Sequence, residues 1–223
     1  MTHPEIEAEQ SHIDRAHLLL EQARDRARKL RGMVEVSRGG TTQARYERDV
    51  IEGSIQNRLG QLQLGSASLI FGRIDLDSDD LFHIGRLAVA DEQQEPVVVD
   101  WRAPVAEPFY RATGRDPMGL VRRRHFVSRG RELLDIEDEL FDLDQLDEGF
   151  QGHGALLAAL DQNRDGQLRD IVATIQGEQD EIIRDPLKGM LIVQGGPGTG
   201  KTVVALHRAA YLLYTHRFPL EGQ

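Results

Sequence analysis

The sequence has no cysteine, and only 5% of its 223 residues are aromatic. The absence of thiols excludes a disulfide framework and a thiolate metal site. No apolar run reaches the length that spans a membrane, and the polar start Met-Thr-His-Pro is not that of a signal peptide. We therefore expect a soluble, cytoplasmic protein with no membrane partner.

Signatures of metal-dependent and serine hydrolases are also missing. The eight histidines form no H-E-x-x-H motif, and the chain has no G-x-S-x-G turn. Residues 161–168 copy the first half of a calcium-binding loop, but its twelfth position is Val172 instead of the required glutamate. The net charge of −10 argues against a surface that coats nucleic acid broadly, while it allows a local basic groove or docking on a protein partner.

One phosphate-binding motif is present in full. Residues 195–202 match G-x-x-x-x-G-K-[ST], the Walker A pattern. Before it, Met190–Val193 is an apolar run that predicts a buried parallel strand, and after it apolar residues recur at helical spacing from Val203 to Leu213. The predicted nucleotide-binding residues are Gly195, Gly196, Pro197, Gly198, Thr199, Gly200, Lys201 and Thr202.

This motif predicts ATP and Mg²⁺ as ligands. Glycines let the backbone N–H groups turn toward phosphate oxygens at a helix N-terminus. Lys201 would neutralise charge on the β- and γ-phosphates, and also in the transition state if the catalytic set were complete. The Thr202 hydroxyl would bind Mg²⁺. Residues 151–223 are therefore expected to begin a RecA-like P-loop α/β domain.

The N-terminal region, residues 1–66, predicts an antiparallel α-helical coiled-coil hairpin. A first apolar seam repeats by sevens between residues 4 and 34, turn-forming residues 37–41 follow, and a second stripe runs from Tyr46 to Leu62. The first seam consists of Ile6, Ile13, Ala16, Leu20, Ala23, Ala27, Leu30 and Val34. An arm about 45 Å long with little core of its own would project, either as a spacer or as a partner-binding probe.

The middle region, residues 67–150, predicts a small antiparallel β domain. Strands are expected at 70–74, 81–87, 96–100, 109–112, 121–128 and 132–136, the last two joined by a turn at Arg129-Gly130. Arginines 122–124, 129 and 131 precede an acidic run from Asp135 to Glu148. These blocks either pair across the hairpin or solvate a face. Alternatively, the arginines contact phosphate or the acidic run docks on a protein partner.

The segment Asp100-Trp-Arg-Ala-Pro104 ends a predicted strand and contains the only tryptophan. A structural turn with an Arg–Asp pair is the favoured interpretation, and a functional contact is the alternative. In total, the sequence predicts an α+β protein of three parts: hairpin, β domain and truncated P-loop domain.

Several runs together resemble a known family. Residues 175–183, 191–202 and 205–214 are similar to motif I and its surroundings in superfamily 1 helicases of the UvrD type. The hairpin, the strands Phe71-Gly-Arg-Ile74 and Ile84-Gly-Arg-Leu87, and residues 98–110 and 134–140 resemble the HelD-type, RNA-polymerase-associated branch.

The resemblance implies a motor that binds RNA polymerase core through its hairpin, releases it from nucleic acid and uses ATP. Arg38, at the predicted hairpin tip, and Arg45 are the expected partner-binding residues. Gln179 stands where the adenine-reading glutamine is expected, with Gln176 as the alternative. The full-length protein could also contact nucleic acid.

The family pattern is incomplete in this chain. A Walker B acidic pair, arginine fingers and a second RecA-like domain do not fit in the residues after Arg217. We therefore interpret the chain as an N-terminal fragment that binds nucleotide weakly at most and does not turn it over. The alternatives are a stand-alone RNA-polymerase-binding module with a vestigial P-loop, and a fragment of a UvrD-type DNA repair helicase.

Overall fold

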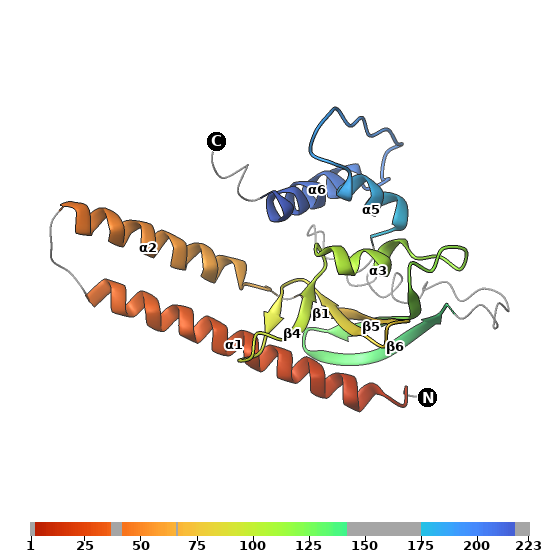
Figure 1. Cartoon of the computed structure of the whole chain (residues 1–223), viewed down its shortest axis with the longest axis horizontal. Helices are drawn as coiled ribbons and strands as arrows, with labels where there is room; N and C mark the ends of the chain where they lie inside the picture. Colours follow the sequence, from red (N-terminus) through yellow and green to blue (C-terminus); the bar gives the residue numbers. More distant parts are fainter. Residues whose placement is uncertain (1–2, 37–41, 66, 142–174, 217–223) are drawn as a thin grey trace.

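The computed structural model describes residues 3–36, 42–65, 67–141 and 175–216. Helices and strands follow one another in groups along these ranges, as in an α+β fold (Figure 1). The elements are α1 (Ile6–Val36), α2 (Thr42–Gln61), β1 (Ile70–Leu76), β2 (Leu81–Gly85), β3 (Val89–Ala90), β4 (Pro96–Asp100), the 3₁₀ turn η1 (Pro104–Ala106), α3 (Glu107–Arg111), β5 (Leu120–Arg129), β6 (Glu132–Leu140), α5 (Gly177–Arg184) and α6 (Lys201–Thr215).

The six strands form one sheet in the order β3-β4-β2-β1-β5-β6. Strands β1, β2, β5 and β6 pair antiparallel, and the predicted β5–β6 turn is confirmed, with Gly130 in the left-handed region at φ 62°. The expectation of a purely antiparallel sheet is wrong, because β2 and β4 pair in parallel. The strand β4 therefore runs in the same direction as β2. The short β3 pairs antiparallel with β4 at the edge of the sheet.

Two other predicted strands are not strands. Residues 109–112 fall largely in the helix α3, where Pro108 occupies the first turn, a position that favours helix formation. Residues 190–193 are extended but join no sheet, and Met190 and Ile192 are 88% and 74% exposed. A strand needs neighbours to accept its backbone hydrogen bonds. No strand in the described ranges pairs with these residues.

Two apolar cores lie on the two faces of the sheet. One face packs against α1 through Ile13, Ala16 and Leu20. On the other face α3 lies next to the sheet and α5 and α6 lie beyond it (Figure 1), and the core on this side includes Phe109, Ile183 and Val204. The strand side chains alternate between these cores: Phe126 belongs to the α1 side and Ile74 to the opposite side.

The apolar residues of the predicted heptad seam of α1 therefore pack mainly against the sheet. Its first half is buried there, whereas Leu30 in the second half is 47% exposed. In this second half α2 runs beside α1, and both extend beyond the sheet (Figure 1). Arg24 of α1 donates hydrogen bonds to the Leu62 carbonyl oxygen just after α2, at 2.9 and 2.5 Å. Both helices are present, and a coiled-coil seam between them stays a prediction.

Candidate nucleotide site and its attachment to the sheet

The Walker A residues form a loop that leads directly into α6. Gly198 and Gly200 have φ values of 80° and 81°, which glycine adopts without strain. The Lys201 Nζ atom donates hydrogen bonds to the carbonyl oxygens of Gly195 and Gly196 at 2.8 and 2.6 Å. The Thr199 hydroxyl also donates to Gly196, at 3.0 Å. Lys201 is thus oriented across its own loop.

Helix α5 brings one of the two candidate glutamines to this loop. The Gln179 Nε2 atom lies 3.3 Å from the position that a Cβ on Gly200 would take. Its Oε1 atom accepts a hydrogen bond from the Gln176 backbone N–H at 3.3 Å. The Gln176 side chain instead accepts from the backbone N–H of Gln179, completing a capping box at the start of α5. Of the two, Gln179 contacts the loop.

The loop residues fit a nucleotide phosphate chain and its metal ion. Lys201 and Thr202 are exposed, and the 15-residue helix α6 directs the positive end of its dipole to the loop. Among the described residues, no group of three or more His, Asp or Glu side chains could hold a metal ion by itself. Mg²⁺ at Thr202 would therefore need nucleotide oxygens among its ligands.

Helix α6 is tied to the end of α5 by Arg208. Its guanidinium donates hydrogen bonds to the carbonyl oxygens of Ile182 at 2.9 Å and Asp185 at 2.7 Å. It also reaches the Pro186 carbonyl oxygen at 3.1 Å. The helix that follows the loop and the helix that carries Gln179 thus form one packed unit.

This unit is attached to the sheet by a buried ion pair on α5. Arg184 Nε donates to both carboxylate oxygens of Asp180 at 2.9 Å, and these side chains are only 7% and 0% exposed. Burial raises the pKa of Asp180, while the charge and hydrogen bond of Arg184 oppose that rise. Arg184 Nη2 donates to the Trp101 carbonyl oxygen at 2.8 Å, directly after β4.

The turn after β4 has the structure that the favoured interpretation of residues 100–104 predicts. Asp100 is buried and accepts two hydrogen bonds from the Arg102 guanidinium at 2.8 and 2.6 Å. The Trp101 side chain is 4% exposed and meets the ring of His207 on α6 edge-on, with ring centroids 5.6 Å apart. The turn is therefore a packing element that touches both α5 and α6.

A charged cluster on the opposite face was only partly predicted. Arg123–Glu139 and Arg124–Asp138 pair across β5 and β6, each with a closest contact of 2.6 Å, as the hairpin interpretation requires. Arg124 lies on the α1 face, whereas Arg123 lies on the α3 side, where it donates to the carbonyl oxygens of Phe109 and Ala112. Arg124 is fully buried, which argues against phosphate contact by this side chain.

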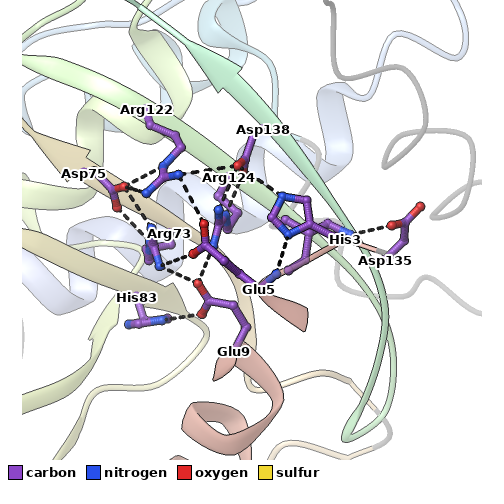
Figure 2. Close-up of polar contacts among 11 residues, drawn as sticks. His3, Glu5, Glu9, Arg73, Asp75, His83, Arg122, Arg124, Asp135 and Asp138 are labelled. Carbon is purple, nitrogen blue, oxygen red and sulfur yellow. Dashed lines mark hydrogen bonds and ion pairs between the residues drawn. The ribbon is translucent and has the colours of Figure 1, made fainter. Parts of the chain in front are cut away.

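The sequence interpretation missed that α1 completes this cluster. Figure 2 shows Glu5 and Glu9 pointing at the arginines of β1 and β5. Glu9, which is 3% exposed, accepts from Arg124 at 2.7 Å and from His83 at 2.8 Å. A signal was available, since Glu9 and Ile13 are one helical turn apart on the buried face of α1.

Electrostatics in the cluster favour the ionised side chains. Burial alone would raise the pKa of Glu9, but the hydrogen bond and charge of His83, with Arg73 and Arg124, lower it to about 2. Burial would lower the pKa of Arg124, and its bonds to Asp138, Glu5 and Glu9 outweigh this and raise it. The cluster therefore joins the base of α1 to the sheet by charge as well as by apolar packing.

Other predicted site residues lie away from these contacts or cannot be placed. Arg45 belongs to α2, and its side chain lies outside the described parts. Arg38 and the calcium-loop copy at 161–168 also fall outside the described residues. No helix in the described ranges is long and apolar enough to cross a membrane.

Comparison with protein families identifies the class of this chain. The model of the DNA helicase IV HelD N-terminal domain matches residues 6–153, which contain both α1–α2 and the whole sheet. The chain belongs to this family, as its sequence resemblance predicts. No curated protein matches the chain.

Proposed function

We propose that the chain is the N-terminal portion of an ATP-dependent, helicase-like motor that binds RNA polymerase core and frees it from nucleic acid. Two observations together support this proposal. The chain contains a HelD N-terminal domain, and its Walker A loop has Lys201 on one side and Gln179 on the other. The first supports the class of motor, and the second supports ATP as its ligand.

The α1–α2 arm is the proposed polymerase-binding element. It extends beyond the sheet (Figure 1), and its outer part exposes Met33, Tyr46 and Val50 at 64%, 71% and 55%. Exposed apolar and aromatic side chains on a projecting element are suited to a protein interface. Arg38 and Arg45 lie in the same outer segment of the sequence and would add charge to that contact.

A pull-down with RNA polymerase core tests this proposal. Deleting all of α1 would remove Glu9 and Leu20 from the sheet, so the deletion must spare the base of the arm. Because Arg24 contacts residue 62, residues near 27 and 59 are opposite each other. Replacing 28–58 with a short glycine-serine linker should keep the sheet and abolish polymerase binding.

The outcomes separate the alternatives. Retained polymerase binding in the shortened protein would refute the arm as the binding element. Polymerase binding without any Lys201-dependent nucleotide binding would favour a stand-alone binding module. No polymerase binding by the unaltered chain, with nucleotide binding intact, would favour a DNA repair helicase. Turnover of ATP that is lost in Lys201→Ala would contradict the expectation that this chain is inactive.

A further inference from the structure

We infer that Arg184 is a positioning residue that couples nucleotide occupancy of the Walker A loop to the turn at Trp101, and through β4 to the base of α1. This inference rests on the proposed nucleotide binding and adds the route by which the site acts on the arm-bearing sheet.

The first step is the contact between the loop and α5. The Gln179 amide lies against Gly200, the residue that immediately precedes Lys201. Phosphate oxygens in the loop would compete with its carbonyl oxygens for Lys201, whose Nζ now donates to Gly195 and Gly196. A ligand in the loop would therefore alter the contacts of Lys201 on one side of Gly200 and of Gln179 on the other. Gln179 is the residue through which α5 would respond to the ligand.

The second step is within α5, which is only eight residues long. Asp180 follows Gln179 directly and holds Arg184 one turn further along. Ile183 is fully buried, and Arg208 of α6 donates to its neighbour Ile182. A short helix fixed at these points moves as one body, because close-packed interiors transmit displacement instead of absorbing it.

The third step is from Arg184 to the sheet. Besides its 2.8 Å bond to the Trp101 carbonyl oxygen, the guanidinium stacks over Tyr211 of α6 with 5.3 Å to the ring centroid. Trp101 follows β4 directly, and Val97 within that strand accepts a hydrogen bond from His12 of α1 at 2.9 Å. One five-residue strand thus joins the Arg184 contact to the helix that forms the arm.

Alternative roles for this contact are weaker. A purely structural pair would need only the Asp180–Arg184 bonds, whereas Arg184 also reaches out of its helix to a backbone carbonyl on the sheet. Arg102, the neighbouring cation, is bound to Asp100 of the sheet and lies over the Tyr214 ring of α6, 4.6 Å from its centroid, so it adds a second link between the two units. Arg184 donates hydrogen bonds to both units, to Asp180 within α5 and to the Trp101 carbonyl oxygen after β4.

The single tryptophan makes the inference measurable in the unaltered chain. Mg²⁺ with a non-hydrolysable ATP analogue is titrated into the protein, with binding followed by calorimetry and Trp101 emission followed in parallel. We expect a saturating change in emission with the midpoint of the calorimetric curve. Arg184→Lys keeps a charge beside Asp180 but loses the planar fork. It should weaken binding about fivefold or more and reduce the emission change at saturation to less than half.

Arg15→Lys is the matched control, since Arg15 lies on the opposite face of the sheet, is 57% exposed and forms an ion pair with Asp91. It should change neither quantity. Calorimetric binding with an unchanged Trp101 signal in the unaltered chain would overturn the coupling and leave the proposed function standing. Absence of calorimetric binding would overturn both. If Arg184→Lys fails to fold, the titration of the unaltered chain still tests the coupling between the loop and Trp101. An unchanged Trp101 emission at saturation overturns that coupling.

Discussion

The two faces of the sheet are held to their helices by different chemistry. On the α1 face, arginines from β1 and β5 meet carboxylates from α1 and β6, above an apolar core. On the opposite face, aromatic rings dominate: Phe109, Tyr110 and Trp101 pack together, and the buried ion pair of α5 is Asp180–Arg184. The same strands supply both faces by alternation, as at Arg124 and His125 of β5.

This difference has a physical consequence for how each face fails. Apolar and aromatic packing weakens gradually as atoms are removed. A buried charge that loses its partner, by contrast, keeps its desolvation cost without the ion pair that offset it. The α1 face should therefore respond sharply to single charge removals and to acid. The opposite face should respond mainly to changes in shape and, through His125, to acid.

The largest effect is expected from Arg124→Met, which breaks the α1 face. Arg124 is fully buried and bonds to Glu5, Glu9 and Asp138, so its loss leaves Glu9 buried with reduced compensation. We expect a loss of about 3–5 kcal/mol in the free energy of unfolding, measured by urea denaturation. Arg131→Met is the control, because its pair with Glu21 is about half exposed and should be worth at most about 1 kcal/mol. Equal losses in the two variants would refute the comparison.

The next effect is expected from Gly72→Ala, which tests shape on the aromatic face. A Cβ at this position would lie 2.3 Å from Phe109 Cε2 and 2.7 Å from the Arg124 backbone oxygen. Since the backbone oxygen cannot move freely, overpacking should lower the free energy of unfolding by about 2–3 kcal/mol. A thermal melt within error of the unaltered protein would contradict the close approach of α3 to β1.

Acid provides a graded test of both faces. Burial, the main cause in each case, lowers the pKa of His12 and His17 on α1, and lowers that of His125 on the aromatic face to about 4. The unfolded chain then binds more protons below about pH 6.5, so stability is complete above that pH and falls as the pH drops. Glu9 adds a loss in the same direction below about pH 4.5.

We expect a loss on the order of 2 kcal/mol from His125 alone between pH 7 and pH 4, measured as the shift in urea midpoint. His125→Gln should reduce the loss between pH 6.5 and 4, and Glu9→Gln should reduce only the part below pH 4.5. A flat profile between pH 7 and 5 would show that the histidines keep ordinary pKa values.

The smallest effect is expected from Gly53→Ala in α2, away from both faces. A Cβ there meets nothing within 4 Å, and glycine inside a helix is less favourable than alanine. The free energy of unfolding of this variant should rise by about 0.5–1 kcal/mol, a change opposite in sign to that of Gly72→Ala. Destabilisation would indicate that the arm makes contacts at this position.

Much of the local structure could be predicted because its signals are local. Turn residues at Arg129-Gly130 and the alternation of β5 and β6 define a hairpin without reference to the rest of the chain. The parallel pairing of β2 and β4 could not be predicted in the same way, since it depends on where the two-residue strand β3 lies. Periodicity says little about a strand of that length.

The site was predictable to a similar extent. The Walker A residues follow from their motif, and Gln179 lies beside Gly200, while its role as the adenine-reading residue stays a prediction. Glu9 was missed because a single acidic residue in a heptad helix is ordinary on a solvated face, and its partner Arg124 is 115 residues away. Arg184 gave no signal in the sequence, because its most informative partner is a backbone carbonyl, which every residue has.

The charged cluster also sets an order of events during synthesis. Glu5 and Glu9 are made before the sheet, and Arg124 and Asp138 leave the ribosome more than a hundred residues after them. At ordinary translation rates α1 must wait on the order of ten seconds before its carboxylates find their arginines. During that interval the apolar stripe of Ile13, Ala16 and Leu20 lacks the part of its core that β5 and β6 supply, Phe126, Leu133 and Ile136. A nascent chain stalled before residue 122 should therefore be a ligand for chaperones, and one released beyond residue 140 should not.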